Sequence, residues 1–332
     1  MSGLKKFFLF FILILAFAWG YKLYFSDEQL RYHSIPKIML KAKHWLDTLE
    51  YRPDILRGYG LKGKKKVVEL FEAYLAIYDY MPEAEKIKID HKLQKIAFLT
   101  LNPRYHDMLK LGDNEFHEDA TSYLRLCYLL EKKGFDTQLY RQEISRALAR
   151  YNGHMWQRGV SQKMIFHRYY EYFQLPEPFS LLEAYKNGII SQRLDIRTLS
   201  LSDVYLLTHE IFAAAGLDGK GAIDFFSQDD IIYIKKTLTR LTQKYLNQRN
   251  VDIVAELLIC MSLIKMEKEK IYKQGLSFLL NSQNPDGSFG SFQYHYKDKV
   301  HKDFYKEAFF LHPTMVTLKV LQLVADNLKT KK

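Results

Sequence analysis

Apolar residues recur along most of the chain at the three- and four-residue spacing of an amphipathic helix. The spacing is clearest in five stretches, which cover residues 69–78, 123–130, 204–215, 231–246 and 251–264. Glycine, proline and asparagine separate the stretches, and no run shows the convincing two-residue alternation of a strand. The pattern therefore predicts an all-α protein of about a dozen helices.

Polar or titratable residues interrupt these apolar helices at a regular spacing. The six positions are Glu72, Asp119, Met164, His209, Glu256 and His312, of which Met164 is the weakest member. The steps between them are about 45 to 50 residues, which suits one helical hairpin. We therefore expect about six hairpins, arranged either as a closed ring with an inner barrel of helices or as an open solenoid.

One short segment favours the closed ring. Residues 283–290 read Gln-Asn-Pro-Asp-Gly-Ser-Phe-Gly and follow an apolar helical run. Pro285 cannot continue a helix and Asp286-Gly287 is a strong turn dipeptide, so Phe289 can fold back onto the preceding helix. The segment resembles the Q-x-x-x-G-x-[WF] corner of the α/α-toroid superfamily, which includes terpenoid cyclases, protein prenyltransferase β subunits and complement-type thioester domains. The resemblance implies an α/α toroid and does not imply a reaction.

The amino-terminal segment has a different composition. Lys5 and Lys6 precede an apolar run over residues 7–20, and this pattern is typical of an export signal. With a snorkelling Lys22, the run approaches the roughly 20 residues that span a bilayer. We therefore expect residues 1–27 to form a signal-anchor transmembrane helix.

The remaining residues, 28–332, are then a toroid domain that lies outside the cytoplasm, because the positive amino end stays inside. The alternative is a cleaved signal peptide and a secreted or periplasmic protein. Ala16-Phe17-Ala18 has the small-x-small form of a cleavage site and supports this alternative.

Charge and cysteine content add little. The net charge is +11, but the lysines form scattered clusters without a nucleic-acid motif, so we expect no nucleic-acid partner. A basic surface suits an anionic membrane or an acidic glycan. Cys127 and Cys260 lie in apolar helical stretches and are predicted to be buried, and the sequence leaves open whether they pair.

Thr208, His209 and Glu210 stand together in an otherwise apolar helix. A buried imidazole needs a partner for each ring nitrogen, so a polar neighbourhood is implied. Because histidine is the usual general acid or base, we predict His209 and Glu210 as catalytic residues and Thr208 as a substrate contact. The alternative is a core histidine that a backbone carbonyl or a carboxylate satisfies.

Asp252 and Glu256 are the only charges in residues 251–264. At positions i and i+4 they share one helical face, with Cys260 one turn further along. Two neighbouring carboxylates can separate their proton affinities and act as an acid and a base, so both are predicted to be catalytic. The alternative makes Asp252 a helix cap and Glu256 the partner of a basic residue on a neighbouring helix.

His312 opens the last predicted helix, at its cap position, with Pro313 in the first turn. We predict His312 as a catalytic residue at a cavity mouth and Thr314 as a substrate contact. The segment resembles the His-Thr segment of prenyltransferase β subunits, where a zinc-binding histidine follows Asp-Phe-Tyr. Here Asp303-Phe304-Tyr305 is present, but His312 comes several residues later than in that pattern.

Other signatures of these families are absent. The Asp-x-Cys that completes the prenyltransferase zinc site, the Asp-x-Asp-Asp acid of cyclases and the Gly-Cys-Gly-Glu-Gln thioester motif are not found at matching places. The combined motifs instead resemble a group of uncharacterised bacterial toroid proteins, over roughly residues 110–325. Arg158 belongs to this resemblance and is expected to bind a substrate anion or to pair with a carboxylate.

Together these residues predict a membrane-anchored toroid enzyme, with His209, Asp252, Glu256 and His312 in a central cavity. His209, Glu256 and His312 are the candidate ligands of a divalent metal such as zinc. The substrate would be envelope-associated: a small molecule, a glycan, a peptide or a lipid-linked molecule. Two other classes stay open, namely a non-catalytic membrane-tethered binding or scaffold domain and a maturation factor for an exported peptide.

Overall fold

The computed structural model of the protein describes residues 34–49, 63–102, 105–219, 221–293, 298 and 302–329. These residues form helices and connecting turns, and no strand occurs within the described ranges. The prediction of an all-α protein is therefore confirmed. The predicted signal-anchor segment, residues 1–27, lies outside the described residues.

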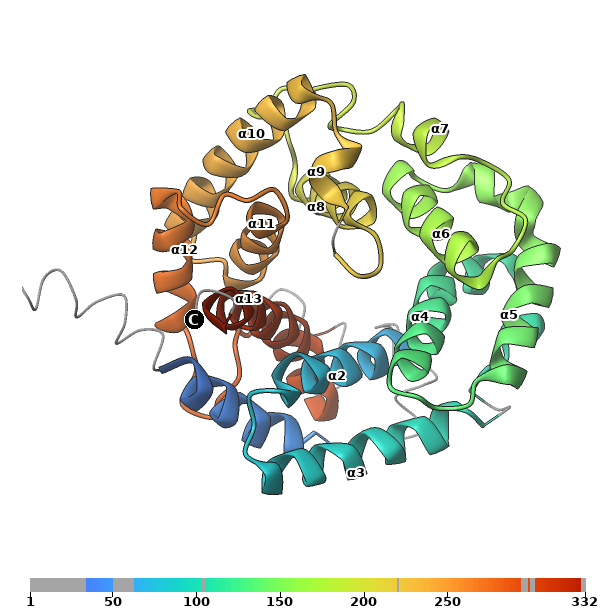
Figure 1. The fold of residues 1–332 in the computed structure, drawn as a ribbon, viewed down its shortest axis with the longest axis horizontal. Helices are drawn as coiled ribbons and strands as arrows, with labels where there is room; N and C mark the ends of the chain where they lie inside the picture. Colours follow the sequence, from blue (N-terminus) through green and yellow to red (C-terminus); the bar gives the residue numbers. More distant parts are fainter. Residues whose placement is uncertain are drawn as a thin grey trace, which may run out of the picture.

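Figure 1 shows the helices as two concentric rings. The inner ring contains α2 (Gly63–Tyr78), α4 (Asp113–Lys132), α6 (Val160–Phe173), α8 (Leu201–Ala215), α11 (Val251–Leu263) and α13 (His312–Lys329). The outer ring contains a helix over residues 34–47, then α3 (Glu83–Thr100), α5 (Gln138–Tyr151), α7 (Leu181–Tyr185), α10 (Gln228–Asn247) and α12 (Lys270–Leu280). Shorter elements are η2 (Met108–Lys110), η3 (Asn152–Gln157), α9 (Ala222–Phe225), η5 (Lys302–Phe304) and η6 (Glu307–Leu311).

The chain alternates between the two rings, so each outer helix is paired with the inner helix that follows it. Inner helices also pack on one another: α13 lies between α11 and α2, α2 contacts α4, and α8 contacts α6 and α11. The first inner helix therefore lies beside the last one, although most of the chain separates them.

The two rings differ in sequence as their surroundings require. Outer helix α10 buries one stripe, which includes Ile234, Leu238 and Leu241, and exposes the opposite face. Inner helix α11 is buried on most of its surface, with every residue from Ile253 to Leu258 inaccessible to solvent. An inner helix must therefore be apolar on most sides, and each polar residue that it carries needs a specific partner.

Polar caps set the starts of two inner helices. Ser200 and Asp203 form a reciprocal capping box at α8, where the Ser200 N–H donates to Asp203 Oδ2 at 2.8 Å. At α11 the Ile253 N–H donates to Oδ1 of Asn250 at 3.1 Å. The alternative in which Asp252 caps α11 is therefore wrong, because Asn250 has that role and Asp252 lies in the first turn.

The regularly spaced polar positions each fall on a different inner helix. Glu72, Asp119, Met164, His209, Glu256 and His312 belong to α2, α4, α6, α8, α11 and α13 respectively. The step predicted from the sequence is thus the length of one outer helix, one inner helix and their connections.

The start of the last helix differs from the prediction. The π-helical turn η6 leads directly into α13, so His312 continues a helix and does not cap one. Pro313 has no N–H to donate to the carbonyl of Phe309, which accounts for the wider turn just before it.

The predicted corner at residues 283–290 joins α12 to the first outer helix. The Gln283 amide donates from Nε2 to the Ile38 carbonyl at 2.9 Å and to the Gly287 carbonyl at 3.0 Å. Phe289 is fully buried, and its N–H donates to Oγ1 of Thr314 at 2.9 Å. The corner therefore links the last hairpin both to the beginning of the described chain and to α13.

Within the described ranges, one helix, Glu307–Lys329, is long and apolar enough to cross a membrane, and 56% of its most apolar window is buried inside the protein. It contains α13, which packs between α11 and α2. Length and composition are weak evidence for a membrane span here, because a core helix meets the same criterion.

We predict that Gly287→Ala destabilises the protein by about 2 to 4 kcal/mol. Gly287 has a φ of +103°, and a Cβ at this position would overlap the carbonyl of Lys41. Urea unfolding of the purified chain, followed by far-UV circular dichroism, measures the change. The control is Gly153→Ala, which meets no atom within 4 Å and should change stability by less than about 1 kcal/mol. Equal effects of the two substitutions would contradict this account of the corner.

Candidate metal centre

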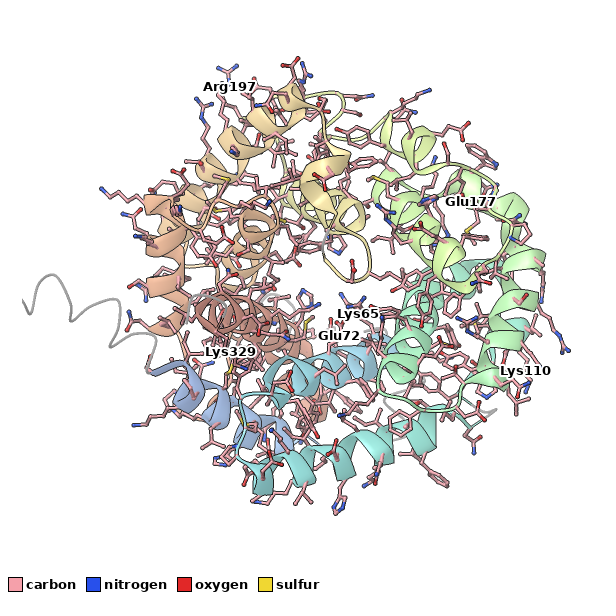
Figure 2. All side chains as sticks on the ribbon, viewed as in Figure 1. Lys65, Glu72, Lys110, Glu177, Arg197 and Lys329 are labelled. Atoms are coloured by element: carbon pink, nitrogen blue, oxygen red, sulfur yellow. The ribbon has the colours of Figure 1, made fainter. Side chains whose placement is uncertain are left out.

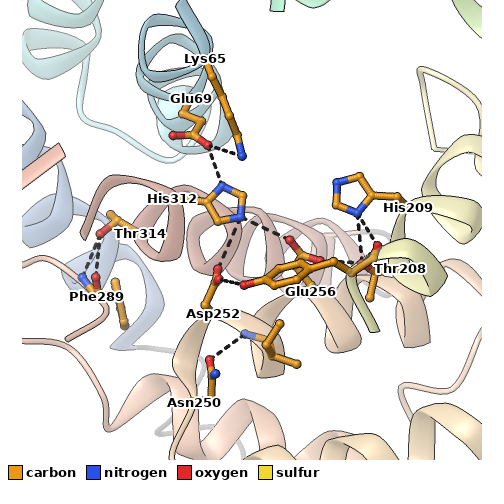
Figure 3. Close-up of polar contacts among 12 residues, drawn as sticks. Lys65, Glu69, Thr208, His209, Asn250, Asp252, Glu256, Phe289, His312 and Thr314 are labelled. Carbon is orange, nitrogen blue, oxygen red and sulfur yellow. Dashed lines mark hydrogen bonds and ion pairs between the residues drawn. The ribbon is translucent and has the colours of Figure 1, made fainter. Parts of the chain in front are cut away.

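A histidine and three carboxylates meet near the first turns of α2, α11 and α13 (Figure 3). Nδ1 of His312 lies 2.8 Å from Oε1 of Glu69, on α2. Nε2 of His312 lies 3.3 Å from Oε1 of Glu256 and 3.5 Å from Oδ1 of Asp252, both on α11. The structure thus brings together three of the predicted residues, Asp252, Glu256 and His312, and adds Glu69.

Two hydroxyl groups of α8 hold the other oxygens of the acidic pair. Tyr205 donates from its hydroxyl to Oδ2 of Asp252, and Thr208 donates from Oγ1 to Oε2 of Glu256, both at 2.6 Å. Oδ1 of Asp252 is buried and has no hydrogen bond within the described part of the chain. Each carboxylate is therefore fixed through one oxygen, while its other oxygen faces Nε2 of His312.

Burial disfavours the charged forms of His312, Asp252 and Glu256, and the contacts among these groups decide the direction in which each pKa shifts. Burial lowers the pKa of His312, but Glu69, Glu256 and Asp252 outweigh burial and raise this pKa to about 10. Burial and the neighbouring Glu256 raise the pKa of Asp252 despite the opposing charge of His312. Burial also opposes ionisation of Glu256, but the hydrogen bond with His312 lowers its pKa. Without a bound cation, these shifts favour an imidazolium at His312 and make protonation easier at Asp252 than at Glu256.

Two lysines add positive charge beside Glu69. Nζ of Lys66 lies 3.0 Å from Oε2 of Glu69, and Nζ of Lys65 lies 3.5 Å from Oε1. Burial would raise the pKa of Glu69, but these lysines and His312 hold it well below its usual range. Figure 2 shows Lys65 pointing toward the centre of the ring, and its side chain is 47% exposed. Solvent therefore reaches the site from the ring interior.

The residues that could hold a metal are Asp252, Glu256 and His312. One ligand atom from each lies within 4.8 Å of the other two. A tetrahedral ion with ligand bonds of about 2.0 to 2.1 Å separates its ligands by about 3.4 Å. The separations of 3.3 and 3.5 Å from Nε2 of His312 match this spacing, whereas both are long for a charge-assisted hydrogen bond.

His209 of α8 stands beside this group without joining it. Its Nδ1 lies 2.6 Å from the carbonyl oxygen of Tyr205 and 3.3 Å from Oγ1 of Thr208. Because a carbonyl only accepts, Nδ1 of His209 carries a proton, and Nε2 is the acceptor nitrogen in this tautomer. The predicted ligand set of His209, Glu256 and His312 is therefore replaced by one in which Asp252 takes the place of His209.

Three other predicted site residues, Glu210, Thr314 and Arg158, lie away from the centre. The carboxylate of Glu210 accepts the N–H groups of Ile189 and Ile190, at 2.9 and 3.2 Å. Thr314 holds the backbone of Phe289 at the corner, as described above.

Arg158 is 3% exposed and follows η3 at the start of α6. Its guanidinium lies 4.3 Å from the centre of the Phe166 ring, and its Nη1 donates to Oε1 of Gln162 at 3.3 Å. Burial lowers the pKa of Arg158 to about 10. None of these contacts connects Arg158 with His312.

Two further findings concern predicted features. Cys127 and Cys260 are both buried and unpaired, which confirms their predicted burial and settles the pairing that the sequence left open.

A pocket of about 470 Å³ lies between the 34–47 helix, α2 and α3, and none of the predicted site residues lines it.

Sequence reasoning missed Glu69, Lys65 and Tyr205. Glu69 precedes Glu72 by one turn in an apolar helix, so the spacing argument used for Asp252 and Glu256 also applies to it. Tyr205 gives no such signal, because a tyrosine in an apolar helix looks like a core residue.

The fold and this site define an all-α protein with a buried acidic and histidine centre. Residues 65–321 match the family described as "Domain of unknown function (DUF6895)", and the chain belongs to this family. The matched region runs from the first turn of α2 into α13, so it contains all the residues of the centre. No curated protein and no solved structure matches the chain.

We predict that Glu210→Gln changes how stability depends on pH. Burial raises the pKa of Glu210 from 4.5 to about 7, in spite of its two backbone hydrogen bonds. Its folded-state pKa is the higher one, so its contribution to stability is complete below pH 4.5 and is lost as the pH rises through 7. The free energy of unfolding of the glutamine variant, relative to that of the parent protein, should therefore rise by roughly 3 kcal/mol as the pH increases from 4.5 to above 7.

Urea unfolding at a series of pH values measures this difference. Glu183→Gln is the contrasting variant, because hydrogen bonds from Ser180 lower the pKa of Glu183. The contribution of Glu183 is present at neutral pH and is lost on acidification, so its pH trend has the opposite sign. A pH-independent difference between Glu210→Gln and the parent protein would contradict this account.

Proposed function

We propose that the protein is a metal-dependent enzyme whose divalent ion, zinc being the best fit, is held by Asp252, Glu256 and His312. The observation that carries this proposal is the pair of separations from Nε2 of His312 to the two carboxylate oxygens, together with a buried Oδ1 of Asp252 that has no hydrogen bond to any described residue. One nitrogen and two carboxylate oxygens are donors that zinc accepts, and three protein ligands leave a position for substrate.

The surroundings of the three residues support the proposal. Metal-binding histidines usually donate their other ring N–H to a carboxylate, and Nδ1 of His312 faces Glu69 in this way. Ligating carboxylates are usually fixed by hydrogen bonds as well, which Tyr205 and Thr208 provide. A bound ion would favour a neutral His312 that donates from Nδ1 to Glu69 and leaves Nε2 free to bind.

A bound zinc ion would supply Lewis-acid polarisation of a substrate carbonyl or phosphoryl oxygen. The other residues have definable tasks. His209 keeps Nε2 as its basic nitrogen and can accept a proton beside the centre. Thr208 links His209 to Glu256, so it holds the base and a ligand in a fixed relation. This arrangement fits hydrolysis or group transfer.

We extend the proposal to architecture and location. The paired helices of Figure 1 and the corner at Gln283, Gly287 and Phe289 support membership in the α/α-toroid superfamily. The apolar run at residues 7–20 supports a signal anchor with the domain outside the cytoplasm. The substrate in that location would be an envelope-associated small molecule, glycan, peptide or lipid-linked molecule.

A second candidate is a non-catalytic membrane-tethered binding or scaffold domain. The observation that favours it is the position of His312, whose two ring nitrogens both face carboxylates. An imidazolium so placed is satisfied without any ligand, and the cluster then only joins α2, α11 and α13. Metal binding distinguishes the two candidates.

We predict that the purified full chain, in a mild detergent, binds about one equivalent of zinc per molecule. Plasma mass spectrometry measures the retained metal, and calorimetric titration of the chelator-treated protein measures affinity. His312→Ala and Asp252→Asn should abolish stoichiometric binding, whereas His154→Ala, at an exposed histidine on η3, should not. Absence of zinc binding in the parent protein, or equal binding in Asp252→Asn, would leave the scaffold candidate.

A subtler change tests the role assigned to Glu69. Glu69→Gln keeps an acceptor for Nδ1 of His312 but removes the negative charge, so zinc affinity should fall by about 10- to 100-fold while the stoichiometry remains one. Calorimetric titration measures both quantities. Unchanged affinity would show that Glu69 does not orient the histidine.

A further inference from the structure

A second charged cluster lies on the inner helices α2, α4 and α13, and on α2 and α13 it lies further along the helix than the metal centre. Arg125 of α4 donates from Nε to Oε1 of Glu72 at 2.5 Å and also forms an ion pair with this oxygen through Nη2. Nζ of Lys319, on α13, lies 3.6 Å from the same oxygen. Two cations therefore share one carboxylate oxygen, and the Lys319 contact is longer than a hydrogen bond.

The cluster shares the helix faces that carry the metal centre. Residues 65, 69 and 72 lie on one face of α2, and Lys319 follows His312 by two turns on α13. The two clusters are therefore stacked along α13 at about 10 Å of helix rise. Figure 2 shows Glu72 and Lys65 at the inner edge of the ring.

The cations of the cluster remain accessible. The side chains of Lys319 and Arg125 are 35% and 24% exposed, although both residues lie in the middle of inner helices. Solvent therefore reaches both cations. Figure 2 shows Lys65 of the metal centre pointing toward the middle of the ring.

The charge balance of the two clusters is positive. The cations are Lys65, Lys66, Arg125, His312 and Lys319, and the carboxylates are Glu69, Glu72, Asp252 and Glu256. Five cations against four carboxylates leave one positive charge, and a divalent metal that takes the place of the proton on His312 would increase it to two. A dianion suits this excess better than a neutral or cationic ligand.

We infer that Arg125 and Lys319 form an oxyanion subsite that receives a phosphate group of the substrate. When no ligand is bound, Glu72 forms ion pairs with both Arg125 and Lys319. The ammonium of Lys319 is the more distant of the two from Glu72, so an incoming phosphate would strengthen its interactions most. The inference deepens the proposed function, on which it rests, because it names the substrate class of the metal centre as a phosphate-bearing molecule.

The test uses the full chain in detergent with inorganic phosphate as the probe, in chelator-containing buffer, so that phosphate binding is measured without metal. Calorimetric titration should detect one phosphate site, and Lys319→Gln should weaken it by at least about tenfold. Lys329→Gln removes an exposed lysine from the end of the same helix and should leave the affinity within about twofold.

Glu72→Gln gives the sharpest outcome. It frees both cations while removing one negative charge, so phosphate should bind several-fold more tightly to this variant. A purely structural ion pair predicts lower stability and no gain in affinity, and that result would overturn the inference. Undetectable phosphate binding, equal losses in the two lysine variants, or equally tight binding of acetate at matched ionic strength would also overturn it.

The two proposals fail separately in this design. His312→Ala should abolish zinc binding and leave phosphate binding near the parent value, because His312 does not contact Glu72, Arg125 or Lys319. Phosphate binding in a protein that binds no zinc would remove the metal centre and keep the subsite. Zinc binding without phosphate binding would keep the metal centre and remove the phosphate subsite.

Discussion

Each inner helix packs between two neighbouring inner helices and against the outer ring. This burial on three sides is the constraint on which the rest of the structure depends. A charged residue on such a helix has only two stable environments: a partner on a neighbouring inner helix, or the interior of the ring. Glu69, Glu72 and Glu256 all satisfy this rule through residues of other inner helices. The polar chemistry of the protein is therefore gathered inside the ring as a consequence of its packing.

The same constraint explains why a bound cation would suit the centre. Lys65 and Lys66 offset two of the three carboxylates around His312, so the third needs a protonated histidine or another positive charge. A proton on Nε2 of His312 and a divalent ion are thus competing solutions to one electrostatic problem. The hydroxyl groups of Tyr205 and Thr208 suit both solutions, because they fix the carboxylates through the oxygens that face away from the histidine.

Periodicity in the sequence was sufficient to predict the helical class and the hairpin repeat, because inner helices are apolar and carry their polar residues at one position per repeat. The periodic positions include Glu256 and His312, which lie on the inner helices α11 and α13. Neighbours in sequence were less informative. Successive residues of a helix point about 100° apart, so Glu210 reaches the turn at Ile189 while His209 stays beside the centre. Glu69 escaped notice because its partner, His312, is 243 residues away, beyond any local pattern.

That separation has a kinetic consequence. The Gln283 amide meets Ile38 across 245 residues, and Glu69 meets His312 across 243, so both contacts form only when the two ends of the domain come together. Asp252, Glu256 and His312 belong to the last two hairpins and can approach one another earlier. Contacts of such high sequence separation close long loops, and we expect them to form late in folding because the loop-closure entropy is lost before the contacts compensate for it. The ligands of the centre would thus assemble before Glu69 arrives, and the completed centre would mark the end of folding.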